Sequence, residues 1–592
     1  MLSHGYVRIM EVNLDKGKGR VIKREDLVNC LGGSGLAAVL YQEYGLPEES
    51  PFHPDQPLIF AIGPLNGLFP LMSKVVLGFK SPYNGYYAET HAGGRMGTIM
   101  RFADIDALVI RGKAQRPSYL VVGSREMNVK DARHLWGLDT TLTARLIRQK
   151  EARAHGKRSI LRIGVSGENL VKIAGINVDT FRHFGRLGAG ALMGSKFLKA
   201  IMLIGDTSFD LDFGSSYKKL YKKLFQDLVG SDLMTKYHGL GTTGNVLPLE
   251  KMKSLPVKNL QATTFPEAEG ISGEYFADKL LLRQIACTGC PIGCIHIGLL
   301  REKFGEEHEY CYRQVSYDHE PVFAMGSMLG ISRAEEVITL LDQVEKFGLD
   351  VISAGVALAW ATEALEKGLI SKEETLAPYK FGSSKEYLEG IQYLSEGTNE
   401  FYRLLGEGVS AAASNYGGED FACVLGQEMA GYATGPIFFV SQAMGFRHSH
   451  LDTAGYQLDQ MREEFTPERA VELLEKEERQ RVLLTSMVAC LFARKLYTPE
   501  VLQEALEAVG LKDQGKNLEE LGEEIRRLRW RVKFSTGFTP EETVIPRRFT
   551  EIKNFKGVPS GEYMKDLIKT YSRSINNLRD NASGMMGDTD PL

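Results

Sequence analysis

Short apolar runs separated by glycine-rich turns fill the first two hundred residues, and this pattern predicts β-strands. The strands at 7–12 and 21–22 flank a turn and indicate a hairpin. The strands at 107–111 and 118–122 flank another turn and form a second predicted pair. Two further runs, 58–62 and 201–204, are apolar throughout, as buried strands are.

After about residue 210 the apolar positions recur at helical spacing. Ser332 and Glu335 match a capping box, and Gly348 ends the apolar face that follows. Thr466 and Thr498 are each followed by proline, which predicts two further helix starts. The charged run 519–531 predicts a solvated helix face.

These patterns predict an α+β fold. At 592 residues the chain is too long for one compact core, so we expect about three domains. The expected domains are a β-rich N-terminal domain at 1–208 and two mainly helical domains at 209–415 and 416–592.

The composition is that of an ordinary soluble enzyme, with 43% hydrophobic and 25% charged residues. A net charge of −4 gives no reason to expect a basic face, so no nucleic-acid partner is expected.

The longest uncharged run, 429–446, is long enough to cross a bilayer, but its glycines and proline favour a buried, irregular segment that lines a cavity. The first residues show no signal peptide, so we expect a cytoplasmic protein without membrane insertion.

Three of the seven cysteines lie within eight residues, at Cys287, Cys290 and Cys294. A loop with this spacing can wrap three thiolates around one iron–sulfur core, and Gly289 and Gly293 permit the backbone angles it needs. Zinc is the alternative, with a further cysteine or His296 as the fourth ligand. Three cysteines in one loop favour a [4Fe–4S] cluster.

Spacing alone does not choose the fourth ligand. Cys311, Cys423 and Cys490 are all eligible, and Cys30 is a more remote candidate. An odd number of cysteines in a large chain also argues against a disulfide scaffold.

Four glycine clusters lie in the N-terminal region, and none has the spacing of a P-loop or a dinucleotide-binding turn. The last cluster, at 185–196, has Arg182, Arg186 and Lys196 nearby and would suit a large ligand with phosphate groups. Tight turns explain any single cluster equally well.

Two groups of titratable residues stand out, Asp318-His319-Glu320 and His448-Ser449-His450. A buried glutamate with a raised pKa beside a histidine can form a proton-transfer pair. The alternative is a hydrogen-bonded core histidine with a surface glutamate.

Together these segments resemble the tungsten-containing aldehyde:ferredoxin oxidoreductases nearly from end to end. The matching segments, in chain order, are 58–67, 80–82, 102–109, 185–201, 287–294, 320 with 326–331, 348–350, and 545–549.

The resemblance implies tungsten, or molybdenum, held by two pyranopterins, with Mg²⁺ bridging the pterin phosphates as a further component. It also implies oxidation of small aldehydes and electron transfer through the cluster to ferredoxin or a ferredoxin-like subunit. By this likeness Cys490 is the fourth cluster ligand, and Glu320 and His450 lie beside the metal and substrate. The implied cofactor-binding residues are Lys74, His91, Gly93, Arg182, Gly185, Arg186, Glu345, Leu349, Asp350 and Leu491.

Several positions depart from the family pattern. Lys74 replaces an arginine, His91 an asparagine, Glu345 an aspartate, and Thr485 an aspartate before the last cysteine. The same cofactors could therefore serve low-potential reduction of an acid or an aromatic thioester. A non-catalytic iron–sulfur subunit of a larger complex is a third hypothesis, and the oligomeric state stays open.

Overall fold

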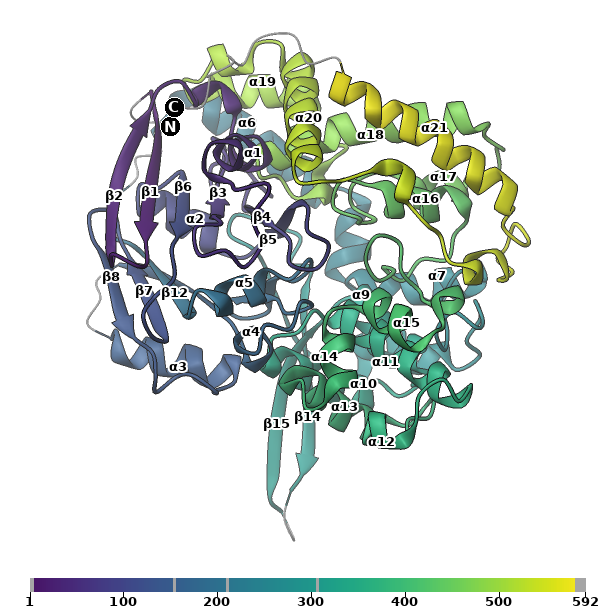
Figure 1. Ribbon diagram of the computed structural model, residues 1–592. Coiled ribbons are helices and arrows are strands. Elements are labelled where there is room, and N and C mark those ends of the chain that lie inside the picture. Colours follow the sequence, from purple (N-terminus) through teal and green to yellow (C-terminus); the bar gives the residue numbers. More distant parts are fainter. Residues whose placement is uncertain (1–4, 153–155, 209–211, 305–307, 581–592) are drawn as a thin grey trace.

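Two six-stranded sheets dominate the N-terminal part of the computed structural model, and helices form most of the rest (Figure 1). The structure describes residues 5–152, 156–208, 212–304 and 308–580. This arrangement confirms the predicted α+β class.

The first sheet has the strand order β2-β1-β6-β3-β4-β5. The predicted N-terminal hairpin is confirmed, because β1 and β2 pair antiparallel with Ile9 opposite Ile22. The strands of this sheet are β1 (Val7–Asn13), β2 (Lys18–Arg24), β3 (Leu58–Ala61), β4 (Val75–Lys80), β5 (Tyr87–Ala92) and β6 (Ala107–Arg111).

The second sheet has the order β11-β10-β9-β12-β7-β8. The predicted strand 118–122 is present as β7, but its pairing with 107–111 is wrong. The connection carries the chain from one sheet to the other, and β7 pairs with β12 and β8 instead. The strands are β7 (Ser118–Val122), β8 (Met127–Asp131), β9 (Lys157–Arg162), β10 (Ile176–Val178), β11 (Arg182–Phe184) and β12 (Leu198–Gly205).

The third sheet, β13-β14-β15, projects from the body as a ribbon (Figure 1). Its strands are β13 (Leu281–Ile285), β14 (Ile295–Lys303) and β15 (Tyr310–Tyr317). Strand β14 begins directly after Cys294, and β15 ends directly before Asp318. The ribbon therefore joins the cysteine loop to the segment that carries Glu320.

Short helices accompany the two large sheets, and helices form most of the chain from residue 319 onward. The first group is α1 (Gly33–Tyr44), α2 (Met96–Phe102), α3 (Thr140–Lys150), α4 (Val165–Glu168) and α5 (Ala189–Ser195). The second is α6 (Gly214–Val229), α7 (Val246–Lys251), α8 (Gly273–Lys279), α9 (His319–Met325), α10 (Ala334–Phe347), α11 (Val351–Glu366), α12 (Lys372–Thr375), α13 (Ser384–Glu396), α14 (Glu400–Gly406) and α15 (Val409–Tyr416). The last is α16 (Pro436–Met444), α17 (Gly455–Gln460), α18 (Pro467–Ser486), α19 (Pro499–Ala508), α20 (Leu518–Ser535) and α21 (Gly561–Asp580).

The helix-start predictions are confirmed at two of three places. Thr466 and Thr498 cap α18 and α19, each accepting a backbone N–H through its side chain. The capping box at Ser332 is wrong, because α10 starts after Arg333 without a side-chain cap. Glu335 instead accepts a hydrogen bond from Tyr275 at 3.0 Å.

The charged run on α20 is not simply a solvated face. Arg526 and Arg529 are only 2% and 3% exposed. Arg526 pairs with Glu478 at 2.9 Å, and Arg529 pairs with Glu89 at 2.8 Å. Buried acidic partners on other elements explain the error, because they leave no trace in the local pattern.

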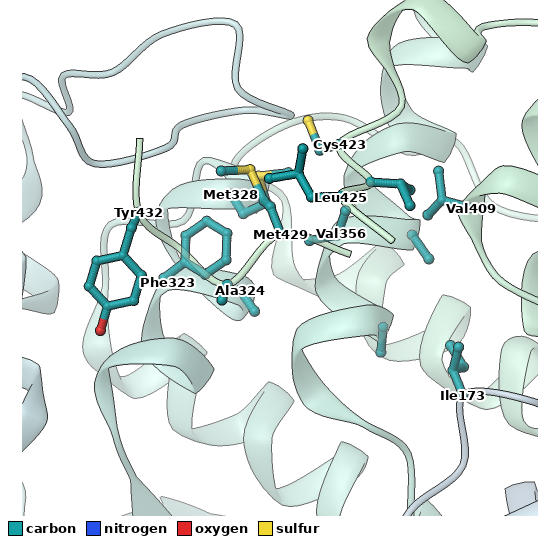
Figure 2. Packing of buried hydrophobic residues seen from close by; sticks show 14 of the residues in the cluster. Ile173, Phe323, Ala324, Met328, Val356, Val409, Cys423, Leu425, Met429 and Tyr432 are labelled. Carbon is teal, nitrogen blue, oxygen red and sulfur yellow. The ribbon is translucent and has the colours of Figure 1, made fainter. Parts of the chain in front are cut away.

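The uncharged run 429–446 is largely buried, as expected, and its second half forms α16. Figure 2 shows Met429 packed with Phe323, Met328 and Leu425 in the main core. Within the described residues, no helix is both long enough and apolar enough to span a membrane.

Candidate active site

A cavity of about 680 Å³ lies between the β-rich part and the helices. All the predicted site residues except Gly93 line this cavity. They are Lys74, His91, Arg182, Gly185, Arg186, Cys287, Cys290, Cys294, Glu320, Glu345, Leu349, Asp350, His450, Cys490 and Leu491.

The cysteine loop connects β13 to β14. Gly289 and Gly293 adopt φ values of +69° and +61°, so the predicted need for left-handed backbone is confirmed. Burial, together with the nearby Cys490 and Cys287, raises the pKa of Cys290 to about 11. The thiols of the loop and Cys490 are thus close enough to influence one another.

Cys490 reaches the loop through a contact between two distant segments. Its N–H donates to the Leu71 carbonyl at 2.9 Å, and the Lys74 N–H donates to the Val488 carbonyl at 3.0 Å. The three remaining cysteines do not line the cavity. Cys423 is buried in the core near Leu425 (Figure 2), Cys30 is 3% exposed in the same core cluster, and Cys311 lies on β15 beside Glu302.

The ligand set fits an iron–sulfur cluster better than one zinc ion. A [4Fe–4S] cluster takes one thiolate on each iron, so its four sulfurs surround a volume. In the part of the chain that the structure describes, no three Cys, His, Asp or Glu side chains are grouped closely enough to hold a single metal ion. His296, the alternative zinc ligand, contacts the His238 carbonyl through Nε2 at 3.0 Å.

Gly93 lies directly behind the loop. A Cβ atom there would stand 2.8 Å from the Cys287 sulfur and 3.2 Å from the Lys74 ammonium nitrogen, so a side chain cannot fit without displacing them. The next residue, Gly94, donates its N–H to the Cys287 sulfur at 3.1 Å. Burial lowers the pKa of Lys74, but Cys490 and Cys287 outweigh it and the net pKa is raised.

We define the α11 wall of the cavity as Arg186, Glu345, Leu349 and Asp350. Asp350 caps α11 and accepts a hydrogen bond from Arg186 at 3.1 Å. Arg186 also donates to the Glu428 carbonyl at 2.8 Å. These contacts fix the guanidinium at the cavity surface.

Glu345 is held from two sides. It contacts His183 Nε2 at 2.5 Å and accepts from Asn177 Nδ2 at 2.8 Å. Burial would raise the pKa of Glu345, but His183 outweighs it and lowers the pKa to about 2.

We define the β5 wall as Glu89, His91, Arg447 and Thr485. Glu89 accepts two bonds from Arg529, at 2.8 and 3.0 Å. Burial would raise the pKa of Glu89, but Arg529 and His91 together outweigh it and the pKa falls to about 2. Ser34 joins this carboxylate to Thr485 through bonds of 2.7 and 2.9 Å.

His91 completes the β5 wall as a neutral imidazole, because burial and then the Arg447 charge lower its pKa to about 4. Its Nε2 lies 3.4 Å from Glu89, and its Nδ1 lies 3.2 Å from Arg447 Nη1. Since arginine can only donate, Nδ1 accepts and Nε2 carries the proton.

Glu320 and His450, predicted from separate motifs, lie together. His450 Nε2 is 3.2 Å from the Glu320 carboxylate, which also accepts from the Tyr432 hydroxyl at 2.8 Å. Burial would raise the pKa of Glu320, but the hydrogen bond and charge of His450, with His319 and Tyr432, together outweigh it. The pKa falls to about 2, so the predicted rise is wrong. The other ring nitrogen, His450 Nδ1, is buried without a hydrogen-bond partner in the described structure. With Nε2 donating to Glu320, Nδ1 is an acceptor and suits a hydrogen bond from a ligand or a water molecule in the cavity.

His448 is not part of this pair. Its Nδ1 contacts the Ala443 carbonyl at 2.8 Å and its Nε2 contacts Lys533 at 3.2 Å. Arg182 lies near both the cysteine loop and the segment that carries Glu320. It contacts Asp318 at 3.4 Å. Burial lowers the pKa of Arg182, but Asp318, Cys287 and Cys294 raise it overall.

Sequence reasoning missed several residues that line the cavity, including Glu89, His183, Arg447 and Tyr432. The sequence held a weak signal for Glu89. Glu89 and His91 are two residues apart on strand β5, so their side chains lie on the same face of a largely buried strand. A charged residue in such a strand requires a partner. No local signal existed for the others.

Two family models match nearly the whole chain. The aldehyde ferredoxin oxidoreductase N-terminal domain matches residues 9–205, and domains 2 and 3 of the same family match residues 219–576. The chain belongs to the aldehyde ferredoxin oxidoreductase family. It is therefore an enzyme of the oxidoreductase class.

Relatives and a solved structure agree with this membership. The tungsten-containing aldehyde ferredoxin oxidoreductase of Pyrococcus furiosus is 35% identical over 419 residues, covering 69% of this chain and 67% of that protein. An aliphatic sulfonate oxidoreductase, WOR-like subunit, from the same organism is 27% identical, covering 69% and 66%. The active-site complex BamBC of benzoyl coenzyme A reductase contains a chain of the same fold, with a TM-score of 0.80 at 19% identity, covering 97% and 94%.

Proposed function

We propose that this protein oxidises aldehydes to carboxylic acids at a tungsten, or molybdenum, bis-pterin centre. Electrons would leave through a [4Fe–4S] cluster on Cys287, Cys290, Cys294 and Cys490 to ferredoxin or a ferredoxin-like subunit. The observation that carries the proposal is the single cavity, which is lined by the four thiols, the Arg186–Asp350 pair and the Glu320–His450 pair.

The reaction adds one oxygen from water to the formyl carbon. An aldehyde and water give a carboxylic acid, two protons and two electrons. The metal centre, when bound, supplies the two-electron redox chemistry. Ionised Glu320 is placed to orient water and to accept a proton, while His450 donates its Nε2–H to that carboxylate and keeps it in place.

The α11 wall supplies Arg186 for anionic parts of the cofactor, and Asp350 fixes its orientation. Lys74 and Arg182 line the cavity near the thiols, where their charges would stabilise an anionic cluster. Gly185 faces open space, which allows a ligand to approach the backbone.

Elemental analysis of the native protein tests the cofactor set. We expect about four iron atoms and one tungsten or molybdenum atom per chain. Iron without either heavy metal would contradict the proposal.

Viologen reduction with short, branched and aromatic aldehydes tests the reaction. Glu320→Gln should abolish turnover while the metal content stays unchanged. If the loaded protein oxidised no aldehyde but reduced an acid or an aromatic thioester, the low-potential reductase would be the better conclusion.

A further inference from the structure

Three cationic side chains line the same cavity as Glu320 and His450. They are Lys236 on the π-helix Met234–His238, Arg481 on α18 and Arg494 after the short helix Leu491–Ala493. Lys236 is exposed and Arg494 is half-buried, whereas Arg481 is 4% exposed. The group therefore extends from the surface into the cavity wall.

These cations have little negative charge to balance them. Arg481 contacts Glu477 at 3.2 Å and donates to the Leu451 carbonyl at 3.0 Å, but its Nη2 is buried without a partner in the described structure. Arg494 bonds the Leu491 carbonyl at 3.1 Å. Within the described residues, neither Lys236 nor Arg494 forms an ion pair with a carboxylate. Burial lowers the pKa of Lys236, and the charge of Arg494 lowers it further.

The cations also lie next to the proposed reaction site. Leu451, which Arg481 holds, directly follows His450 in the chain. Tyr237, the neighbour of Lys236, stacks on Phe492 with ring centroids 4.2 Å apart. Burial raises the pKa of Tyr237, as do the nearby Tyr456, Glu320 and Cys490. Tyr237 therefore lies near both Glu320 and Arg494, and an aldehyde held at Glu320 would have its far end near the cations.

We propose that Lys236, Arg481 and Arg494 select aldehydes that carry a carboxylate, or a similar anionic group, at the end remote from the formyl carbon. This inference rests on the proposed aldehyde oxidation and names its substrate class. Cationic side chains that line a cavity suit such a group, because charge-assisted hydrogen bonds gain strength away from water.

An acidic redox protein is the competing occupant, since Arg494 lies four residues after Cys490. Burial decides against it. Arg481 is 4% exposed and lines the cavity, so the surface of a protein cannot contact it.

The test compares 4-oxobutanoate with butanal, which have the same chain length and differ in the terminal carboxylate. With the holoenzyme and a viologen acceptor, we expect kcat/KM for 4-oxobutanoate to exceed that for butanal at least tenfold. In Lys236→Gln/Arg494→Gln this ratio should fall at least tenfold. Lys495→Gln, an exposed lysine outside the cavity lining, serves as the matched control and should keep the wild-type ratio.

Binding of the product anions gives a readout that does not depend on turnover. Succinate should raise the melting temperature of the wild type more than butyrate does, and the double variant should lose this difference. If no aldehyde were oxidised, the proposed function would fail, and the succinate and butyrate shifts would still decide the inference.

Two results would overturn the inference. One is oxidation of both aldehydes with equal kcat/KM by the wild type, together with equal thermal shifts. The other is a raised KM for ferredoxin in the double variant with an unchanged ratio for the two aldehydes, which would assign the cations to the redox partner.

Discussion

The two walls of the cavity hold their residues by different means. On the α11 wall, Asp350 supports Arg186 and also caps the helix that begins beside it. On the β5 wall, Glu89 depends on Arg529, which is 440 residues away, and Thr485 depends on Ser34, which is 451 residues away. The first wall combines a local helix cap with the ion pairs of Arg186 and Glu345, and the second joins residues 34–91 to residues 447–529.

The largest effect is expected from Glu89→Gln on the β5 wall. The variant leaves Arg529, which is 3% exposed, without its main charge partner, and breaking such a buried pair costs about 3–5 kcal/mol. Urea unfolding of the purified protein measures the loss. The exposed pair of Lys172 with Glu407 provides the control, because Glu407→Gln should cost less than about 1 kcal/mol. Equal midpoints for the two variants would contradict the comparison.

Acid should weaken both walls in the same pH range. The pKa values of Glu89 and Glu345 are about 2 in the folded protein, against 4.5 for the free side chain. Each ionised carboxylate therefore stabilises the folded protein fully above pH 4.5. This stabilisation, about 3 kcal/mol for each residue, is lost as the pH falls towards 2. Unfolding midpoints measured from pH 6 to pH 2.5 should fall less steeply in Glu89→Gln and in Glu345→Gln than in the wild type. A parallel fall in all three proteins would contradict these assignments.

A smaller effect is expected from Asp350→Asn on the α11 wall. The amide oxygen can still cap α11, and Arg186 keeps its bond to the Glu428 carbonyl at 2.8 Å. The loss is that of one hydrogen bond between charged groups, about 1.5–3 kcal/mol. The same urea experiment measures it, and a loss larger than that of Glu89→Gln would reverse the order of the two walls.

The smallest effect is expected from Thr485→Val, which keeps the shape of the side chain and removes the hydroxyl that Ser34 bonds at 2.9 Å. About 1 kcal/mol should be lost, because Ser34 keeps its bond to Glu89. An unchanged midpoint would show that Thr485 contributes nothing to the β5 wall.

The contrast between the walls also explains what the sequence could predict. The cysteine loop, the caps at Thr466 and Thr498 and the hairpin of β1 and β2 are local patterns, and the structure reproduces them. The family likeness named residues that line one cavity, including Glu320 and His450 from separate motifs.

The failures have a common physical cause. Arg526 and Arg529 fit a solvated helix face until their buried partners Glu478 and Glu89 are known. The strands at 107–111 and 118–122 fit a hairpin until the second sheet supplies other partners. Long-range pairing overrides local pattern in each case, and a single sequence does not record it.

The contact between the segments at 71–74 and 488–490 has a consequence for biosynthesis. The four proposed cluster ligands include Cys490, whose N–H is held by the Leu71 carbonyl, while Met72 pairs with Ala489. A ribosome that has made the first 480 residues has therefore released only three of these thiols. On the proposed ligand set, the complete cluster can be installed only after Cys490 has emerged and its segment has joined residues 71–74. Assembly of the cluster would then depend on the packing of the segment at 488–490 against the N-terminal part of the fold.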